Sequence, residues 1–182
     1  MSDSEAQRTI ITADDYGLSR GITDSILETS DRGALTRVSV LTNGYAAGYA
    51  IDEWRKRAEH LELSLHFNLT EGKPLSAPTD VPHLVDTQGD FRYGPGGLLL
   101  QTLLHWKRKT LHEEIKRELA AQVAFIRSRV SNDVPLFIDG HQHVHMVPLV
   151  FDAIVALHVE RPFAGVRMPR EPFARIPSHI HA

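Results

Sequence analysis

The sequence predicts an α/β fold with a mainly parallel β-sheet, either open or closed into a barrel. Short runs of β-branched and aliphatic residues alternate along the chain with helical segments, the order that produces β-α-β units. Polar residues directly follow several of these runs, and in parallel sheets the carboxyl ends of the strands form the ligand-binding edge. A chain of 182 residues with 42% hydrophobic residues fits one domain, and we expect a single domain over residues 1–182.

Three strands are expected in the first half of the chain. Residues 9–13 favour β-structure and lead directly into Asp14 and Asp15. An amphipathic helix is expected over residues 22–32, with Ile22, Ile26 and Leu27 on its apolar face. Gly33 ends this helix in the usual way. The remaining elements of this half are a strand at 38–41, a helix at 46–59 and a strand at 61–67.

The second half begins with a long segment of irregular composition. Residues 68–97 are rich in Pro, Gly, Asp and Thr without periodicity, and so long a loop in a compact domain is usually functional. A helix over 111–130 is indicated by apolar residues on one face. That face consists of Ile115, Leu119, Val123 and Ile126. The last expected elements are a strand at 135–138, a helix at 147–159 and a strand at 166–168.

Composition excludes several classes of function. The net charge of -3 and the isoelectric point near 6.4 argue against binding to nucleic acid or to an anionic membrane. The chain contains no cysteine, so disulfides, thiolate metal sites and cysteine nucleophiles are excluded. No apolar run approaches the ~18 residues of a membrane span, and the first residues lack a signal-peptide pattern. We therefore expect a cytoplasmic location.

Side chains suited to a divalent metal follow the strands. Asp15, His66 and His141 supply one carboxylate and two imidazoles, a ligand set that leaves positions open for water and substrate. Because successive side chains on a strand point to opposite sides, Asp14 is free for another task. It could take a proton from a metal-activated water. The alternatives are that the Asp pair caps a helix and that His66 is an ordinary surface residue.

The segment 141–145 repeats histidine at alternate positions, and on an extended backbone these side chains share a face. His141 lies nearest the strand and is the expected ligand. His143 and His145 lie further out and are expected to support the metal ligands, contact substrate or join the core. Asp139 could orient an imidazole or cap a turn. Histidine-rich tracts also occur without metal.

Three further charged residues are candidates for lesser roles. Arg167 and Arg170 flank the last expected strand, where a guanidinium could hold a polar substrate. A solvated ion pair with Glu171 is the alternative. Glu71, in the long loop, reads as a residue without chemical consequence.

The expected reaction is hydrolysis of an amide or ester. The sequence contains neither a glycine-rich phosphate loop nor a dinucleotide-binding fingerprint. It also lacks the Gly-x-Ser-x-Gly elbow of serine hydrolases. Metal-assisted attack of water on a carbonyl is the chemistry that the strand-end residues fit.

Three motifs resemble the YdjC-like carbohydrate deacetylases, a family that includes chitooligosaccharide deacetylases. They are the segments 12–19, 65–75 and 139–146, which read TADDYGLS, LHFNLTEGKPL and DGHQHVHM. The segment 166–171 is similar to a later Arg-x-Pro motif of the family, so the resemblance spans residues 9 to 171. Tyr16 stands where many members have phenylalanine.

The resemblance implies a distorted (β/α) barrel like that of polysaccharide deacetylases. It also implies a divalent metal, Mg²⁺ or Zn²⁺, held by Asp15, His66 and His141, with Asp14 as the general base. The implied reaction removes acetyl from an N-acetylated sugar or oligosaccharide. His143, Arg167 and Arg170 are the expected substrate contacts.

Family members generally continue beyond the point where this sequence stops. We therefore expect an incomplete barrel that lacks the family's C-terminal part. Either the protein is a shortened member whose open edge is covered in a homodimer, or the sequence is a piece of a longer chain. Two alternatives to the deacetylase follow. One is a catalytically impaired protein that binds metal and sugar, and the other is a metal hydrolase for another ester or a phosphoester.

Overall fold

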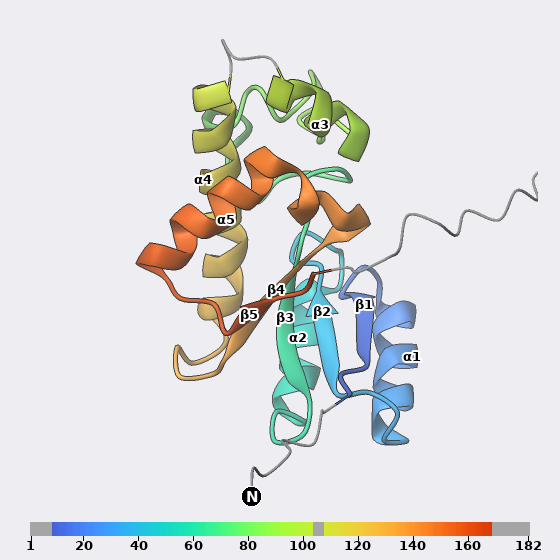
Figure 1. Ribbon diagram of the computed structural model, residues 1–182. Coiled ribbons are helices and arrows are strands. Elements are labelled where there is room, and N and C mark those ends of the chain that lie inside the picture. The colour runs from blue at the N-terminus through green and yellow to red at the C-terminus, as the bar shows by residue number, and fades with distance from the viewer. Residues whose placement is uncertain (1–8, 104–107, 169–182) are drawn as a thin grey trace, which may run out of the picture.

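The structure is a computed structural model, and it describes residues 9–103 and 108–168 (Figure 1). Within this part, five strands form one sheet in the order β1-β2-β3-β4-β5, and every pair is parallel. The strands are β1 (Thr12–Tyr16), β2 (Arg37–Val40), β3 (Glu62–Phe67), β4 (Leu136–Gly140) and β5 (Gly165–Val166). The predicted α/β fold with mainly parallel strands is confirmed.

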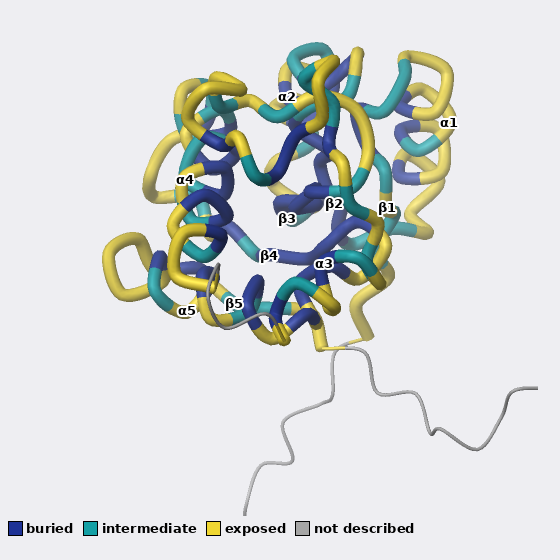
Figure 2. The backbone as a smooth tube through the Cα atoms, turned by 90° about the horizontal axis from the view of Figure 1, so that it is seen from above, coloured by how far each residue is buried: buried dark blue, intermediate teal, exposed yellow. Residues whose placement is uncertain are grey.

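Helical segments connect successive strands. The helices are α1 (Arg20–Asp31), α2 (Ala47–Arg55), α3 (Pro95–Leu103), α4 (Arg108–Arg127) and α5 (Pro148–Glu160), with short 3-10 helices η1 (Pro78–Asp80) and η2 (His141–Met146). Viewed from above the strands, α1, α2, α4 and α5 lie around the outside of the sheet (Figure 2). Within the described residues, no helix has the length and apolar composition needed to cross a bilayer.

The core is built from the strands together with the buried faces of α2, α4 and α5. β2 is buried along its whole length, and β3 is buried from Leu63 to Phe67. The predicted apolar face of α4 is confirmed, since all four of its residues are buried. Each such aliphatic side chain contributes about 1.5–3 kcal/mol of hydrophobic free energy. This rigid centre fixes the carboxyl ends of β2, β3 and β4, from which the site is built.

Several elements differ from the prediction. Helix α3 was not predicted, because Pro95-Gly96-Gly97 resembles a loop. In the structure this helix lies beyond the carboxyl ends of the strands and buries Leu98. Helix α2 ends at Arg55 rather than near residue 59, where backbone turns follow. On α1 the buried residues are Thr23, Leu27 and Ser30, whereas Ile22 is exposed. Thr23 can be buried on this face because its hydroxyl donates to the Ser19 carbonyl and accepts from the Gly17 N–H.

Candidate metal centre

Three side chains meet at the carboxyl edge of the sheet. Asp15 is in β1, His66 is the next-to-last residue of β3, and His141 directly follows β4. Asp15 Oδ1 lies 3.2 Å from His66 Nε2 and 3.0 Å from His141 Nδ1. The two imidazole nitrogens are 3.3 Å apart, and the rings meet edge to face. The structure thus brings together the three residues expected as ligands, which we call the triad.

The spacing of the triad fits a divalent ion. Donor atoms about 2.0–2.2 Å from one metal ion are themselves roughly 2.8–3.6 Å apart in tetrahedral or octahedral geometry. All three separations fall within this interval. Both histidines are buried whereas Asp15 is partly exposed, so the centre is open to solvent on one side. A carboxylate and two imidazoles on an open edge are typical of a catalytic rather than a structural metal centre.

A bulge in β1 delivers Asp15 to this position. The pairing of β1 with β2 shifts between Ala13 and Tyr16, and Asp15 adopts a left-handed backbone with φ of 58°. Such a conformation is uncommon for a residue other than glycine and is concentrated at functional sites. The bulge interrupts the alternation expected for the Asp pair. Both Asp14 and Asp15 therefore have carboxylate oxygens near His66.

Asp139 lies on the far side of the His66 ring. The register of β3 and β4 pairs these two residues, and His66 Nδ1 lies 3.4 Å from Asp139 Oδ1 and 3.2 Å from Ser39 Oγ. A carboxylate at one imidazole nitrogen orients the other nitrogen toward a metal. Burial lowers the pKa of His66, but its contacts with Asp139 and Asp15 outweigh burial and raise that pKa to about 9.

Arg167 joins the two outer carboxylates. Its Nη1 donates to Asp14 Oδ1 at 2.8 Å and to Asp139 Oδ2 at 3.0 Å. Burial raises the pKa of Asp139, yet hydrogen bonds from His66 and Arg167 lower it well below its usual range. Oxygen or nitrogen atoms of Asp14, His66 and Asp139 lie within 4.8 Å of one another. Asp14 is thus held beside the triad by a side chain from the last described strand end.

The histidine-rich segment is not extended, and this part of the prediction is wrong. Residues 141–146 form η2, in which Gln142 and His143 have left-handed backbones with φ of 51° and 58°. Of the three histidines in this segment, only His141 belongs to the triad. His143 is exposed, with its ring 6.0 Å from that of His145.

His145 is a buried structural residue. Its Nε2–H donates to the Arg167 carbonyl at 2.9 Å, and burial lowers the pKa of the ring, which favours the neutral form. A Cβ on Gly140 would lie 2.4 Å from His145 Nδ1, so the close approach requires glycine at 140. His145, packed against Gly140, thus positions the backbone of Arg167 through this hydrogen bond. Arg170 lies outside the described residues.

Polar residues that the sequence prediction missed hold the long loop in place. Gln122 Nε2 donates to the Asn68 carbonyl at 2.7 Å, and its Oε1 accepts from the Asn68 N–H at 3.2 Å. The buried carboxylate of Glu118 accepts from the backbone N–H groups of Leu75 and Ser76. The buried Glu114 accepts from His83. The signal for them was their spacing by four residues along α4, beside its apolar face.

A hollow of about 410 Å³ lies between the ends of β2 and β3 and the long loop. Glu71, which contacts His141 of the triad, is part of its lining. Its lining is partly apolar, from Leu18 and Leu41, and partly polar, from Lys73 and Asp90. The Tyr45 ring at this hollow is fully exposed.

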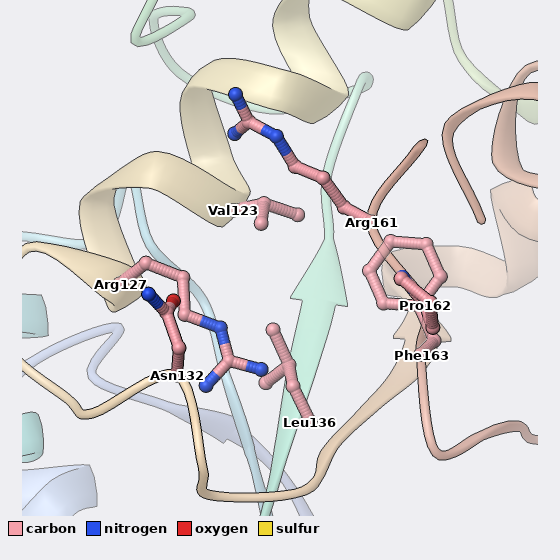
Figure 3. A pocket seen from close by; sticks show the side chains of 7 residues that line it. All are labelled: Val123, Arg127, Asn132, Leu136, Arg161, Pro162 and Phe163. Carbon is pink, nitrogen blue, oxygen red and sulfur yellow. The ribbon is translucent and has the colours of Figure 1, made fainter. Parts of the chain in front are cut away.

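A second cavity, of about 480 Å³, lies near the amino ends of β4 and β5 (Figure 3). Arg127 there donates to the carbonyls of Ser131 and Val134 beyond the end of α4. These hydrogen bonds satisfy two backbone carbonyls of the segment that follows α4. The cavity is remote from the triad and offers none of the proposed ligands.

Comparison with known proteins places these features in a family. The chain matches the model for the family described as YdjC-like protein over residues 8–181. It is 29% identical over 177 residues to a carbohydrate deacetylase of Danio rerio, and this match covers 95% of the chain and 54% of the relative. It is 31% identical over 171 residues to a carbohydrate deacetylase of Halalkalibacterium halodurans, a match that covers 88% of the chain and 68% of the relative.

A solved structure shares the fold. It is the crystal structure of an Enterococcus faecalis V583 protein with a suggested role in cellobiose-phosphate cleavage. It superposes with a TM-score of 0.72 at 27% identity, covering 89% of this chain and 59% of that chain. The chain thus spans a little over half the length of two of these three proteins and about two thirds of the third.

Proposed function

The chain belongs to the YdjC-like protein family, and on this premise we propose that it is a metal-dependent hydrolase that removes acetyl from an N-acetylated sugar or oligosaccharide. The observation that carries the proposal is the triad, whose three donor atoms have the spacing of ligands to one divalent ion. Two relatives named carbohydrate deacetylase support the choice of reaction.

We propose Asp15, His66 and His141 as the residues that hold the ion. A divalent metal bound there would supply Lewis acidity and make an attacking water more acidic. The donor set suits both Mg²⁺ and Zn²⁺, because imidazole favours zinc and carboxylate accommodates either ion. Asp139 would orient His66 through its outer nitrogen.

Asp14 is the proposed general base. Its carboxylate lies beside His66 and is held by Arg167, so it is in place to take a proton from the attacking water. Addition of the water oxygen to the acetyl carbonyl and cleavage of the C–N bond would yield acetate and the free amine of the sugar. The amine must gain a proton as it leaves, and Asp14 could return the one it accepted.

The hollow beside the triad is the proposed place for the sugar. Its mixed lining suits a carbohydrate, whose rings present apolar faces and polar edges. The exposed Tyr45 ring offers a flat surface for such a face. His143 and Arg167 remain proposed substrate contacts, since both are exposed, His143 lies two residues after His141, and Arg167 is bonded to Asp14. A homodimer and a cytoplasmic location stay predictions, which light scattering and cell fractionation would test.

Acetate release tests the proposal. Metal-stripped protein would be supplied with Mg²⁺ or Zn²⁺ and incubated with N-acetylated mono- and oligosaccharides, with and without a phosphate group. We expect acetate release that requires metal and that slows by at least about 100-fold in Asp14→Asn. Release of inorganic phosphate without acetate would instead indicate a phosphoester hydrolase. Binding of sugar without either product would indicate a protein that binds metal and sugar but does not turn over.

A further inference from the structure

We propose that Glu71 is a positioning residue that keeps His141 in the tautomer with its hydrogen on Nε2, so that Nδ1 can bind the metal. The inference rests on the metal site of the proposed function but not on its reaction. The two histidines of the triad present different nitrogens to the centre. His66 presents Nε2 to the centre, whereas His141 presents Nδ1. Each ring therefore needs a group at its opposite nitrogen.

For His66 that group is Asp139, and for His141 it is Glu71. Glu71 Oε2 lies 3.3 Å from His141 Nε2. Nε2 is buried and makes no hydrogen bond of ordinary geometry with any described residue. A hydrogen on Nε2 would face the carboxylate favourably, whereas a lone pair there would face a negative charge.

The choice of tautomer matters because Asp15 favours the opposite arrangement. Asp15 Oδ1 lies 3.0 Å from His141 Nδ1 and would accept a hydrogen from it. That hydrogen would occupy the lone pair that a metal requires. A carboxylate at Nε2 counteracts this pull and favours the ring form that can bind the ion.

The loop holds Glu71 firmly for this task. Its carbonyl accepts from Asn43 Nδ2 at 2.9 Å and from Asn68 Nδ2 at 2.8 Å, and its N–H donates to Asn68 Oδ1 at 3.2 Å. Asn68 directly follows β3, and Asn43 lies three residues beyond the end of β2. The Glu71 side chain also accepts from Gln142 Nε2 at 2.5 Å, beside His141. Glu71 is thus fixed to the ends of three neighbouring strands, although the sequence suggested no chemical role for it.

Metal affinity separates this role from a merely structural one. Metal-stripped wild-type protein, Glu71→Gln and Glu71→Ala would be titrated with Zn²⁺ against a competing chelator, and with Mg²⁺ by calorimetry. We expect Glu71→Ala to weaken Zn²⁺ binding by about 10–100-fold, as for other residues that orient a metal ligand. Glu71→Gln keeps an oxygen that can accept from Nε2–H and should lose less. Glu59→Gln, at an exposed carboxylate away from the site, is the matched control and should bind like wild type.

A spectroscopic measurement completes the test. In the Zn²⁺-loaded wild type, the Nε2–H of His141 should exchange slowly with water by ¹⁵N-edited NMR, and in Glu71→Ala it should exchange fast. Zn²⁺ affinity within twofold of wild type in Glu71→Ala, or unchanged exchange, would overturn the inference. Absence of metal binding by the wild type would overturn it together with the metal site. Metal binding that depends on Glu71, without acetate release, would leave it standing while the proposed reaction fails.

Discussion

Replacing Asp139 with Asn tests how the centre is held together before any metal binds. The two side chains have nearly the same shape, so the change removes a buried charge from between His66 and Arg167. In the metal-free protein the pKa of His66 is raised from 6.5 to about 9, which corresponds to about 3 kcal/mol of preference for the protonated ring. Among the groups that raise this pKa, Asp139 is the strongest. The substitution should therefore remove about half or more of that preference.

The sign of the pH dependence follows from the direction of the shift. Because the folded pKa of His66 lies above the unfolded value, its stabilisation is complete below about pH 6.5 and is lost as the pH rises through about 9. Urea unfolding of metal-free wild type should show the free energy of unfolding falling by about 3 kcal/mol between pH 6.5 and 9.5. In Asp139→Asn the fall should be about 1 kcal/mol. Asp52→Asn, at an exposed carboxylate, serves as the control. Equal pH dependence in Asp139→Asn and wild type would refute this account of His66.

Three further predictions concern the surroundings of the triad. Asp14→Asn should lower the rate of acetate release by about 10²–10⁴-fold while leaving the Zn²⁺ affinity within a few-fold of wild type. Kinetics and chelator competition would measure the two effects. A rate near wild type would exclude Asp14 as the base. Gly140→Ala should cost about 1–3 kcal/mol in urea unfolding, because the added Cβ meets His145; unchanged stability would show that the turn relaxes freely. Tyr45→Ala should raise KM by about 2–12-fold without lowering kcat, because it loses about 0.5–1.5 kcal/mol of ring contact. Tyr45→Phe should behave like wild type, and an effect confined to kcat would place the sugar elsewhere.

The sequence was sufficient to predict the fold and the members of the triad. The apolar stripe of α4 and the β-rich runs are local patterns, and they survive in the structure because packing reinforces them. His66 and His141 could be selected because parallel strands gather their carboxyl ends on one edge. The rule needs only the order of the elements and not their exact geometry.

Features that depend on backbone detail were beyond the sequence. The left-handed conformation of Asp15 and the turn at Gln142 and His143 decide which atoms face the centre, and no local pattern encodes them. Helix α3 was hidden by its proline and glycines, and its formation depends on tertiary packing. The contact of Glu71 with His141 joins residues 70 positions apart, so it appears only once the strands are assembled.

A crystal structure of the Zn²⁺-loaded protein would show whether Asp15, His66 and His141 hold one divalent ion. We expect a single strongly scattering ion bound by Asp15 Oδ1, His66 Nε2 and His141 Nδ1, with bonds of about 2.0–2.2 Å. Asp14 should lie beside the ion without binding it. An ion held by other side chains, or bound through Nε2 of His141, would contradict the account.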